Sequence, residues 1–174
     1  MSLAASVLTR PTDRLLALSR SLVADIPADR FARFPTVDGA PVVMNHPAFV
    51  LGHLTLYPGR IVTVCGMDPS IAAAPEGYQE LFAPDVECVD DPEGTVYPGK
   101  EAMIATYFDL HEKAIEVVKG LRDEDFEREL DIERHRKAFG TSGGATSFLL
   151  GAHAGFHLGQ ISGWRRVMGL GPAF

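Results

Sequence analysis

The segment that most constrains the fold of this chain is residues 145–168, near its C-terminal end. Apolar side chains recur there at helical spacing, which predicts one long helix. The segment nevertheless contains Gly151, Gly155, Gly159 and Gly163, and each glycine costs about 1 kcal/mol relative to alanine in a helix interior. Small residues at four-residue steps allow another helix to approach. We therefore expect this helix to pack closely against a neighbour.

The same helix contains His153 and His157, four residues apart, so both imidazoles project from one face. Two neutral imidazoles at this spacing can share a zinc, nickel, iron or copper ion. The other residues of this face are mostly apolar, which indicates that it points into the protein: Thr146, Leu149, Leu150, Phe156, Gln160, Trp164 and Val167. The alternative interpretation is that one histidine is buried, the other is exposed and no metal binds.

A third candidate ligand lies in the sequence AFVLGHLTLY, residues 48–57. His53 lies on the apolar stripe of a second expected helix, and Gly52 beside it would permit the close approach of another backbone. Three histidines from two helices would leave one or more coordination positions for water or substrate, as catalytic zinc sites do. We therefore predict a metal site formed by His53, His153 and His157.

Three further segments, including the one around His53, show helical periodicity, and signals for strands are sparse. We therefore predict an all-α fold. The first segment covers about residues 12–25, where Thr9 or Thr12 could cap the helix. The second begins near Asn45, which is a good N-cap residue, and the third spans residues 100–119.

Prolines and glycines mark where these helices should end. Pro58 followed by Gly59 should end or kink the second helix near Tyr57, because proline lacks a backbone donor and its ring clashes with the preceding turn. Gly120 should end the third helix. Residues 66–99 contain many prolines, glycines and acidic residues, so we predict a long irregular loop between the second and third helices.

The length and charge of the chain limit what it can be. With 174 residues, it is expected to form one domain, residues 1–174, around a single core. The formal net charge of −7 argues against a nucleic-acid partner, which requires a basic surface. No apolar run reaches the roughly 20 residues needed to span a membrane, so no membrane association is expected. Cys65 and Cys88 form neither a disulfide framework nor a CxxC motif, so we expect a cytoplasmic location.

Three other residues are candidates for the pocket around the metal, although none is assigned a catalytic role. His111 lies on the apolar face of the third helix, where it either lines the pocket or forms a hydrogen bond in the core. Gln160 follows His157 by about one turn, where it either orients a ligand or packs between helices. Tyr57 is either a pocket residue or part of the core.

The spacing of these residues resembles the DinB/YfiT-like metalloprotein superfamily. The matching motifs are LGHL at residues 51–54 and HAGFHLGQISGWRRVMG at residues 153–169. The order of the helices also fits, so the resemblance covers nearly the whole chain. It implies a four-helix bundle that holds a divalent metal ion, zinc or nickel, on three histidines, and often forms a homodimer. Relatives with known activity resemble metal-dependent transferases or isomerases that use low-molecular-weight thiols.

The chain departs from this family pattern in two places. Relatives often carry an acidic residue four positions after the first metal-binding histidine, whereas this chain has Tyr57. The loop at residues 66–99 is also long. Because substrate pockets are built from such parts, the resemblance does not identify the small-molecule substrate.

The resemblance leads to an enzyme hypothesis in which a thiol bound to the metal is deprotonated and attacks an electrophilic substrate. A metal-dependent hydrolase would use the same ligands but would need a general base, for which His111, Glu76 or Glu80 are candidates. A non-catalytic, metal-binding stress-response module is the third possibility. A closed fourth protein ligand would favour the module, and an open coordination position would favour an enzyme.

The glycines of residues 145–168 also predict a homodimer. Gly151, Gly155, Leu158 and Ser162 are expected on the outward side of this helix, where a second copy could approach. The alternative is that the N-terminal helix of the same chain covers this side.

Overall fold

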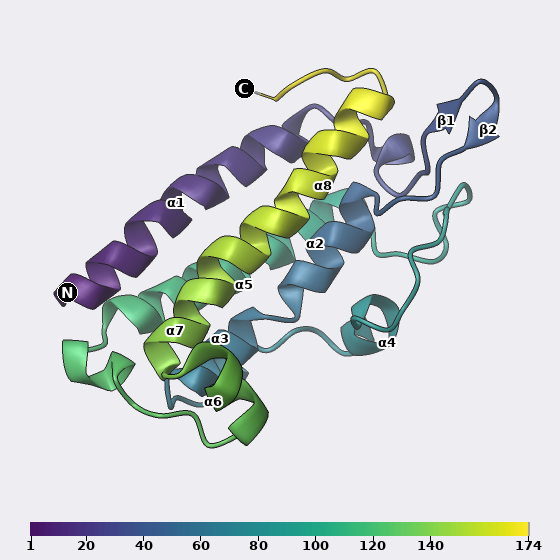
Figure 1. Ribbon diagram of the computed structural model, residues 1–174. Helices are drawn as coiled ribbons and strands as arrows, with labels where there is room; N and C mark the ends of the chain where they lie inside the picture. The colour runs from purple at the N-terminus through teal and green to yellow at the C-terminus, as the bar shows by residue number, and fades with distance from the viewer. Residues whose placement is uncertain (174) are drawn as a thin grey trace.

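The computed structural model describes residues 1–173 and shows a mostly helical, all-α protein (Figure 1). The helices are α1 (Leu3–Ala24), α2 (Pro47–Thr55), α3 (Pro58–Val64), α4 (Tyr78–Phe82), α5 (Lys100–Lys119), α6 (Glu133–Phe139), α7 (Ser142–Ser147) and α8 (Ala154–Val167). The shorter elements are the 3-10 turns η1 (Ala28–Arg30), η2 (Pro69–Ala72) and η3 (Asp123–Phe126), the π-helical segment η4 (Phe148–His153), and the paired strands β1 (Thr36–Val37) and β2 (Ala40–Pro41).

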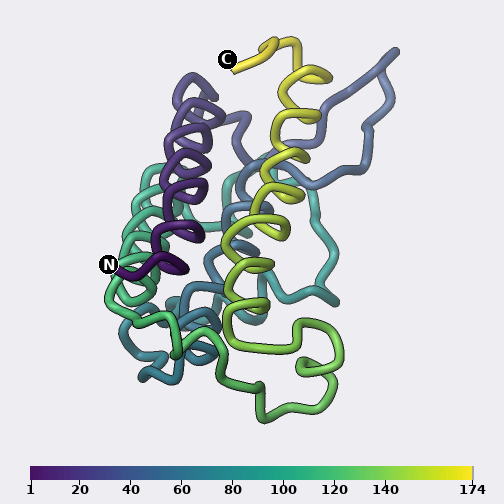
Figure 2. The backbone as a smooth tube through the Cα atoms, turned by 60° about the vertical axis from the view of Figure 1, so that its left-hand side comes forward, coloured from purple at the N-terminus to yellow at the C-terminus, as the bar shows by residue number. Residues whose placement is uncertain are grey.

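The longer helices run side by side, as Figures 1 and 2 show from two directions, and their buried side chains form one core. α1 packs against α5 and α8, while α2 packs against α5 and α8. The core between them includes Leu51 of α2, Met103 of α5 and Trp164 of α8, each at most 1% exposed. Because α2 and α8 are in contact, side chains on their facing sides can meet. No helix in residues 1–173 is long and apolar enough to cross a membrane.

The bounds of α5 and the break after α2 agree closely with the sequence prediction. α5 spans Lys100–Lys119 and has Gly120 as its C-cap. α2 ends at Thr55 and α3 begins at Pro58, so the proline does interrupt the helix near Tyr57. The predicted N-cap Asn45 is wrong by one residue, because the ring of His46 caps α2 by accepting a hydrogen bond from the Phe49 amide.

α1 begins well before its predicted start, so the prediction that Thr9 or Thr12 caps it is wrong. Ser2 is the N-cap, and the hydroxyl groups of Thr9 and Thr12 instead donate to backbone carbonyls of their own helix. The helix continues through Pro11. The proline removes the amide that would bond to the Val7 carbonyl, but both residues are exposed, so water can bond to that carbonyl instead.

The C-terminal helical segment is continuous but not uniform. Thr141 caps α7, and the chain then passes through η4 before it continues as α8. A π-helical turn contains an extra residue relative to an α-helical turn, so it shifts the faces of the residues on either side relative to each other. His153 is the last residue of η4, and His157 follows in α8. The shift therefore falls at the predicted metal site.

The predicted irregular loop at residues 66–99 is mostly non-helical but is well packed. It contains η2 and α4, and Phe82 at the end of α4 is fully buried. The carboxylate of Asp91, 5% exposed, accepts hydrogen bonds from the amides of Thr95, Val96 and Tyr97. The Asp91 bonds order the loop internally, and α4 packs against α2, so that the loop can form one wall of a cavity there.

Candidate metal centre

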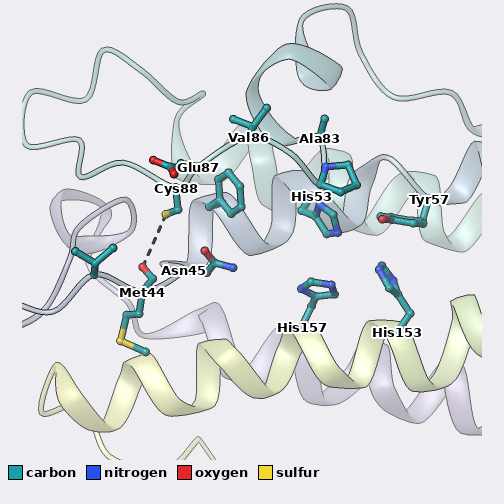
Figure 3. A pocket seen from close by; sticks show the side chains of 13 residues that line it. Met44, Asn45, His53, Tyr57, Ala83, Val86, Glu87, Cys88, His153 and His157 are labelled. Atoms are coloured by element: carbon teal, nitrogen blue, oxygen red, sulfur yellow. Dashed lines mark hydrogen bonds between the residues drawn. The ribbon is translucent and has the colours of Figure 1, made fainter.

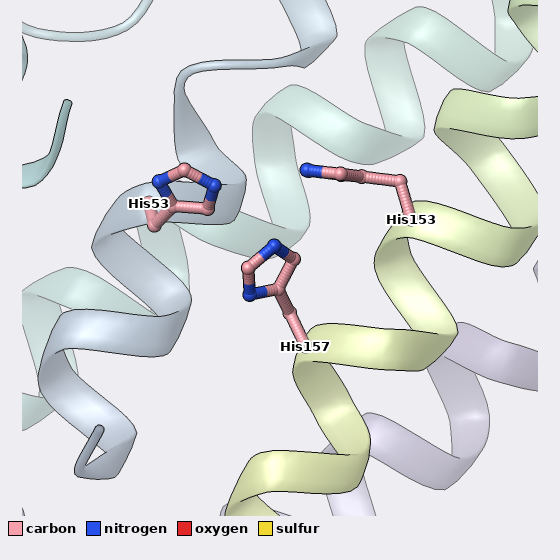
Figure 4. A group of neighbouring side chains, drawn as sticks. All are labelled: His53, His153 and His157. Carbon is pink, nitrogen blue, oxygen red and sulfur yellow. The ribbon is translucent and has the colours of Figure 1, made fainter. Parts of the chain in front are cut away.

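Three histidines from two distant parts of the chain come together beside α2 and α8 (Figure 4). His53 comes from the middle of α2, His153 from the end of η4 and His157 from the first turn of α8. One ring nitrogen from each residue lies within 4.8 Å of the corresponding nitrogens of the other two. The three residues that the sequence predicts as ligands therefore form a cluster that could hold a metal ion.

The rings face one another closely enough for joint coordination. The ring centroid of His157 is 4.6 Å from that of His53 and 4.6 Å from that of His153. Nitrogens bound to a tetrahedral zinc ion at about 2.0–2.1 Å would lie roughly 3.4 Å apart. The cluster is thus slightly wider than a closed zinc site, and small rotations of the side chains would bring the nitrogens to coordination distance.

Hydrogen bonds orient two of the rings so that their Nε2 atoms remain free. The Nδ1 atom of His53 bonds to the backbone carbonyl of Phe82 at 2.8 Å. The Nδ1 atom of His157 bonds to Oε1 of Gln160 at 3.3 Å, and that oxygen also accepts from Nδ2 of Asn45 at 3.1 Å. A proton on Nδ1 in both rings places the lone pair on Nε2, as metal-binding histidines require.

The third ring, that of His153, has an unsatisfied nitrogen. Its Nδ1 atom is buried and has no hydrogen-bond partner within residues 1–173. Buried polar atoms in proteins almost always have a partner, so an atom without one indicates a missing water or ion. This orphaned nitrogen belongs to a three-imidazole donor set that could hold a metal ion.

Tyr57 completes one side of the cluster. Its ring centroid lies 4.1 Å from that of His153 and 5.1 Å from that of His53. Its hydroxyl group points toward the histidines (Figure 3). The guanidinium carbon of Arg60 lies 4.7 Å from the centroid of the Tyr57 ring. Burial raises the pKa of the Tyr57 hydroxyl, so it remains protonated at neutral pH and can donate a hydrogen bond.

The electrostatic environment keeps all three imidazoles neutral. Burial lowers the pKa of His53 and that of His157. Burial, and then the proximity of His157 and His53, lowers the pKa of His153 to about 4. A metal binds the neutral ring, so the cluster is ready to bind at neutral pH without first releasing protons.

The histidines lie at the edge of a large open cavity, of about 600 Å³ (Figure 3). The residues that line it come from α2, the β2–α2 connection, the segment after α4, and the C-terminal helix: Val43, Met44, Asn45, Phe49, His53, Tyr57, Ala83, Pro84, Val86, Glu87, Cys88, His153 and His157. A cavity of this size is within the range that holds small-molecule ligands. The 66–99 loop thus does form part of a pocket beside the cluster.

The three additional pocket candidates have different positions. Tyr57 lines the cavity, and Gln160 bonds to His157. His111 is 4% exposed and does not line it. Instead its Nδ1 atom bonds to the Tyr107 carbonyl at 2.7 Å, so the core interpretation of His111 is the correct one.

The predicted direction of the histidine face needs correction. Phe156 is 69% exposed and Val167 is 40% exposed, so these residues do not point into the core. Trp164 of the predicted face is buried, and the other core-facing residues of α8 are Ala154, Leu158, Ile161 and Arg165. The histidines lie on the flank of this face, half-buried toward the cavity. The sequence argument assumed an unbroken α-helix, whereas the π-helical turn of η4 changes the alignment of residues across it.

The role predicted for Gly52 also differs from the structure. Within residues 1–173, the three atoms that a Cβ at position 52 would approach most closely all belong to the Phe82 side chain. The ring of Phe82 packs there instead, and a Cβ atom at position 52 would lie 2.3 Å from that ring. The backbone carbonyl oxygen of the same Phe82 accepts the hydrogen bond from Nδ1 of His53. Gly52 therefore leaves room for Phe82, the residue whose carbonyl orients His53.

Several residues of the site carry no sequence signal that would have identified them. Asn45, Glu87 and the Phe82 carbonyl contact the cluster or its cavity only because distant segments fold together. The carboxylates of Glu76 and Glu80, considered as general bases, do not line the cavity, whereas Glu87 does.

The fold and the site together define an all-α protein with a three-histidine cluster that could hold a metal ion at the edge of a large cavity. No protein-family model matches the chain, and no curated protein matches it.

Proposed function

We propose that this protein is a DinB/YfiT-like four-helix-bundle enzyme, a metal-dependent transferase that joins a low-molecular-weight thiol to an electrophilic small molecule. The helices of the bundle would be α1, α2 with α3, α5, and the α7–α8 segment, whose mutual contacts suit this architecture. The motifs around His53 and His153–Gly169 support the family proposal.

The observation that best supports an enzyme is the open side of the histidine cluster. Within residues 1–173, no fourth histidine, cysteine, aspartate or glutamate joins His53, His153 and His157. The cluster borders a cavity of about 600 Å³ rather than packed core. Three protein ligands beside a cavity leave positions for an exogenous ligand, which is the arrangement of catalytic rather than structural sites.

The protein residues have separable roles in this proposal. His53, His153 and His157 would hold a divalent ion, and the Phe82 carbonyl and Gln160 orient two of these rings. A bound divalent ion would supply a Lewis acid that keeps the thiol in its thiolate form near neutral pH. The thiol would lose its proton to solvent, its sulfur would form a new bond to the electrophilic carbon, and the electron pair of the bond that breaks would depart with the leaving group.

Tyr57 would act as a hydrogen-bond donor beside the reacting atoms. Its hydroxyl is protonated and points toward the histidines, so it can stabilise negative charge that develops on the electrophile or leaving group. This role would account for a tyrosine where related sequences often carry an acid. No nucleophilic residue of the protein is required.

A metal-dependent hydrolase is the second candidate, and one observation favours it. Glu87 lines the cavity and is the only carboxylate of residues 1–173 that does so, which makes it a candidate general base. A non-catalytic metal-binding module has less support, because such a module does not require an open cavity beside its ion. The free thiols of Cys65 and Cys88 agree with the cytoplasmic location that we also propose.

The proposed function is tested by asking whether a thiol reaches the metal. Untagged protein would be loaded with cobalt, and bacillithiol, mycothiol, glutathione or cysteine would be added in turn. We expect at least one thiol to produce a sulfur-to-cobalt charge-transfer band, and the same thiol to give no band with His157→Ala. If no thiol produces a band while small anions still perturb the cobalt spectrum, the transferase is wrong and the hydrolase becomes the better hypothesis.

A further inference from the structure

A second cavity, of about 380 Å³, lies on the other side of the histidine cluster from the large cavity. Its walls come from α3, the segment that follows η3, α6 and the start of the C-terminal helix: Tyr57, Arg60, Thr63, Val64, Arg128, Leu130, Asp131, Ile132, His135, Phe139, Ala145, Phe148, Leu149 and His153. None of the sequence arguments predicts this cavity, because its walls are assembled from four separate segments.

The two cavities share two residues, Tyr57 and His153, which line both. The centroids of these rings lie 4.1 Å apart, so the pair forms the partition between the cavities. Both rings lie at one edge of the large cavity in Figure 3. A molecule in the second cavity would therefore contact the same Tyr57 and His153 side chains that face the metal cluster.

The interior of the second cavity is apolar. Leu130 is 5% exposed and Ala145 is 2% exposed, and they lie among the buried residues of its walls. Ile132, 57% exposed, and Phe148, 39% exposed, are apolar residues that reach the solvent beside them. An apolar pocket of a few hundred Å³ with a small number of polar groups is typical of a small-molecule site.

Two arginines provide the main charge of this cavity. Arg60 lies over the face of Tyr57, and the Arg128 side chain donates to the Val64 carbonyl, so contacts with the wall hold both guanidinium groups. Within residues 1–173, neither guanidinium has a carboxylate oxygen within 4.0 Å. The one carboxylate among the lining residues is that of Asp131. The balance of charge is therefore positive, and the guanidinium donors are available to an anion.

The large cavity has the opposite character. Its lining includes Glu87 but no lysine or arginine. In the metal-free protein, a small molecule with a carboxylate and an apolar body is therefore attracted to the second cavity and repelled from the first. The two cavities therefore suit two different ligands and are not two copies of one site.

We propose that the second cavity binds an organic carboxylate with an apolar or aromatic body, held through Arg60 and Arg128. The carboxylate lies at the guanidinium groups, and the apolar body extends over Leu130 and Leu149. This binding requires only the residues of the cavity. The further statement that this ligand is the electrophilic substrate, with the thiol in the large cavity, rests on the function proposed above.

The test measures binding to full-length, metal-free protein by isothermal titration calorimetry, with 3-phenylpropanoate as the probe and its neutral amide, 3-phenylpropanamide, as the comparison. We expect the carboxylate to bind at least about fivefold more tightly than the amide, and Arg60→Gln or Arg128→Gln each to weaken it by about fivefold, as for a charge-assisted hydrogen bond. Arg14→Gln, which replaces an exposed arginine outside the cavity, should leave the affinity unchanged.

Two further variants locate the bound probe. Thr63 is exposed at the cavity wall, so Thr63→Trp should fold normally and block binding. Glu87→Gln removes the negative charge of the large cavity and should leave the affinity unchanged. Equal binding of the acid and the amide, unchanged affinity in both arginine variants, or tighter binding to Glu87→Gln would each overturn the proposal.

These outcomes are independent of the cobalt and thiol experiment. Because the protein is metal-free, failure of the thiol to bind the metal does not affect the binding of 3-phenylpropanoate. Conversely, a protein that gives the thiol-to-cobalt band but does not bind the carboxylate would retain the proposed function and lose this inference.

Discussion

The imidazole rings of His53 in α2 and His157 in α8 lie with their centroids 4.6 Å apart and their planes inclined by 48°. Each ring bonds through Nδ1 to a different acceptor, the Phe82 carbonyl and the Gln160 side chain. The packing of α2 against α8 thus sets the spacing of two candidate ligands, and local hydrogen bonds set their direction. Metal binding should therefore depend on both the ligands and these supporting contacts.

Each of the three histidines should be required for tight metal binding. Alanine at His53, His153 or His157 should weaken cobalt or zinc affinity by more than about 100-fold, because loss of an outer-shell partner alone costs about 10–100-fold. His135→Ala, which changes a histidine outside the cluster, serves as the control. Metal titration with circular dichroism would measure both affinity and folding. Unchanged stoichiometry in the His153 and His157 variants would exclude the site.

The helical fold should persist without metal. The chain has an extensive apolar core of its own, unlike small zinc-dependent domains that unfold when the ion is removed. We expect the far-ultraviolet spectrum of chelator-treated protein to remain helical, with a lower midpoint of thermal unfolding than the metal-loaded form. A cooperative loss of helix on chelation at 25 °C would show instead that the ion is structural.

Gln160 should tune metal affinity without being a ligand. Its Oε1 atom accepts from both His157 and Asn45, so Gln160→Leu removes the acceptor that orients His157. We expect cobalt affinity to fall by about 10-fold or more, with stoichiometry retained. Gln79→Leu, at an exposed position in α4, is the matched control. If both variants bind cobalt like the wild type, Gln160 has only a packing role.

Replacing a glycine with alanine should lower the stability of the protein where the glycine contacts a site residue. It should raise the stability where the glycine faces open space. A Cβ atom at Gly52 would lie 2.3 Å from the Phe82 ring, so Gly52→Ala should destabilise the protein by about 1–3 kcal/mol through overpacking. Displacement of Phe82 should also weaken metal binding through His53. A Cβ atom at Gly159 meets nothing within 4 Å, so Gly159→Ala should stabilise α8 by up to about 1 kcal/mol. Urea unfolding of the metal-free variants measures both changes.

The stability of the metal-free protein should fall in mild acid, partly because of His111. Burial lowers the pKa of His111 from 6.5 to about 4. Between these values the unfolded chain binds a proton that the folded chain does not, so the free energy of unfolding decreases as the pH falls from 6.5 to 4. The His111 contribution to this loss is roughly 3 kcal/mol. In His111→Leu, urea unfolding at several pH values should show a shallower decline; an identical slope would contradict the prediction.

The homodimer remains a prediction, but the residues expected at its interface change. Leu158 is 3% exposed, so it packs inside the chain and does not belong to the outward side. α1 packs beside η4 and α8, yet a Cβ atom at Gly151 or Gly155 would meet nothing within 4 Å. These glycines and the exposed Phe156 remain available to a second copy. Gly155→Leu should convert a dimer to a monomer in sedimentation while the helical spectrum persists. A wild-type protein that is monomeric at tens of micromolar would refute the dimer.

Much of the fold and the three candidate ligands could be predicted from the sequence because their signals are local. The apolar period and Gly120 predicted the bounds of α5, and Pro58 predicted the break after α2. A four-residue spacing places His153 and His157 on one side of a helix whatever the rest of the chain does. The inward direction of His53 followed from its apolar neighbours.

The tertiary structure decided the features that depend on contacts between distant segments. The Phe82 carbonyl that orients His53, the Asn45 amide that bonds to Gln160, and the cavity lined by Arg60 and Arg128 have no period or motif in the sequence. Such contacts depend on where separate elements are packed, and many sequences of similar pattern would place them differently.

The clearest example is Arg165, whose position near the C-terminal end of α8 would by itself suit it to complement the dipole of its own helix. In the structure it is 1% exposed, and it donates to the Leu22 carbonyl and to the Asp25 carboxylate at the end of α1. The sequence determined that a cation stands near a helix C-terminus, because charge and position along one helix are local properties. Only the packing of α8 against α1 determined which helix that cation caps.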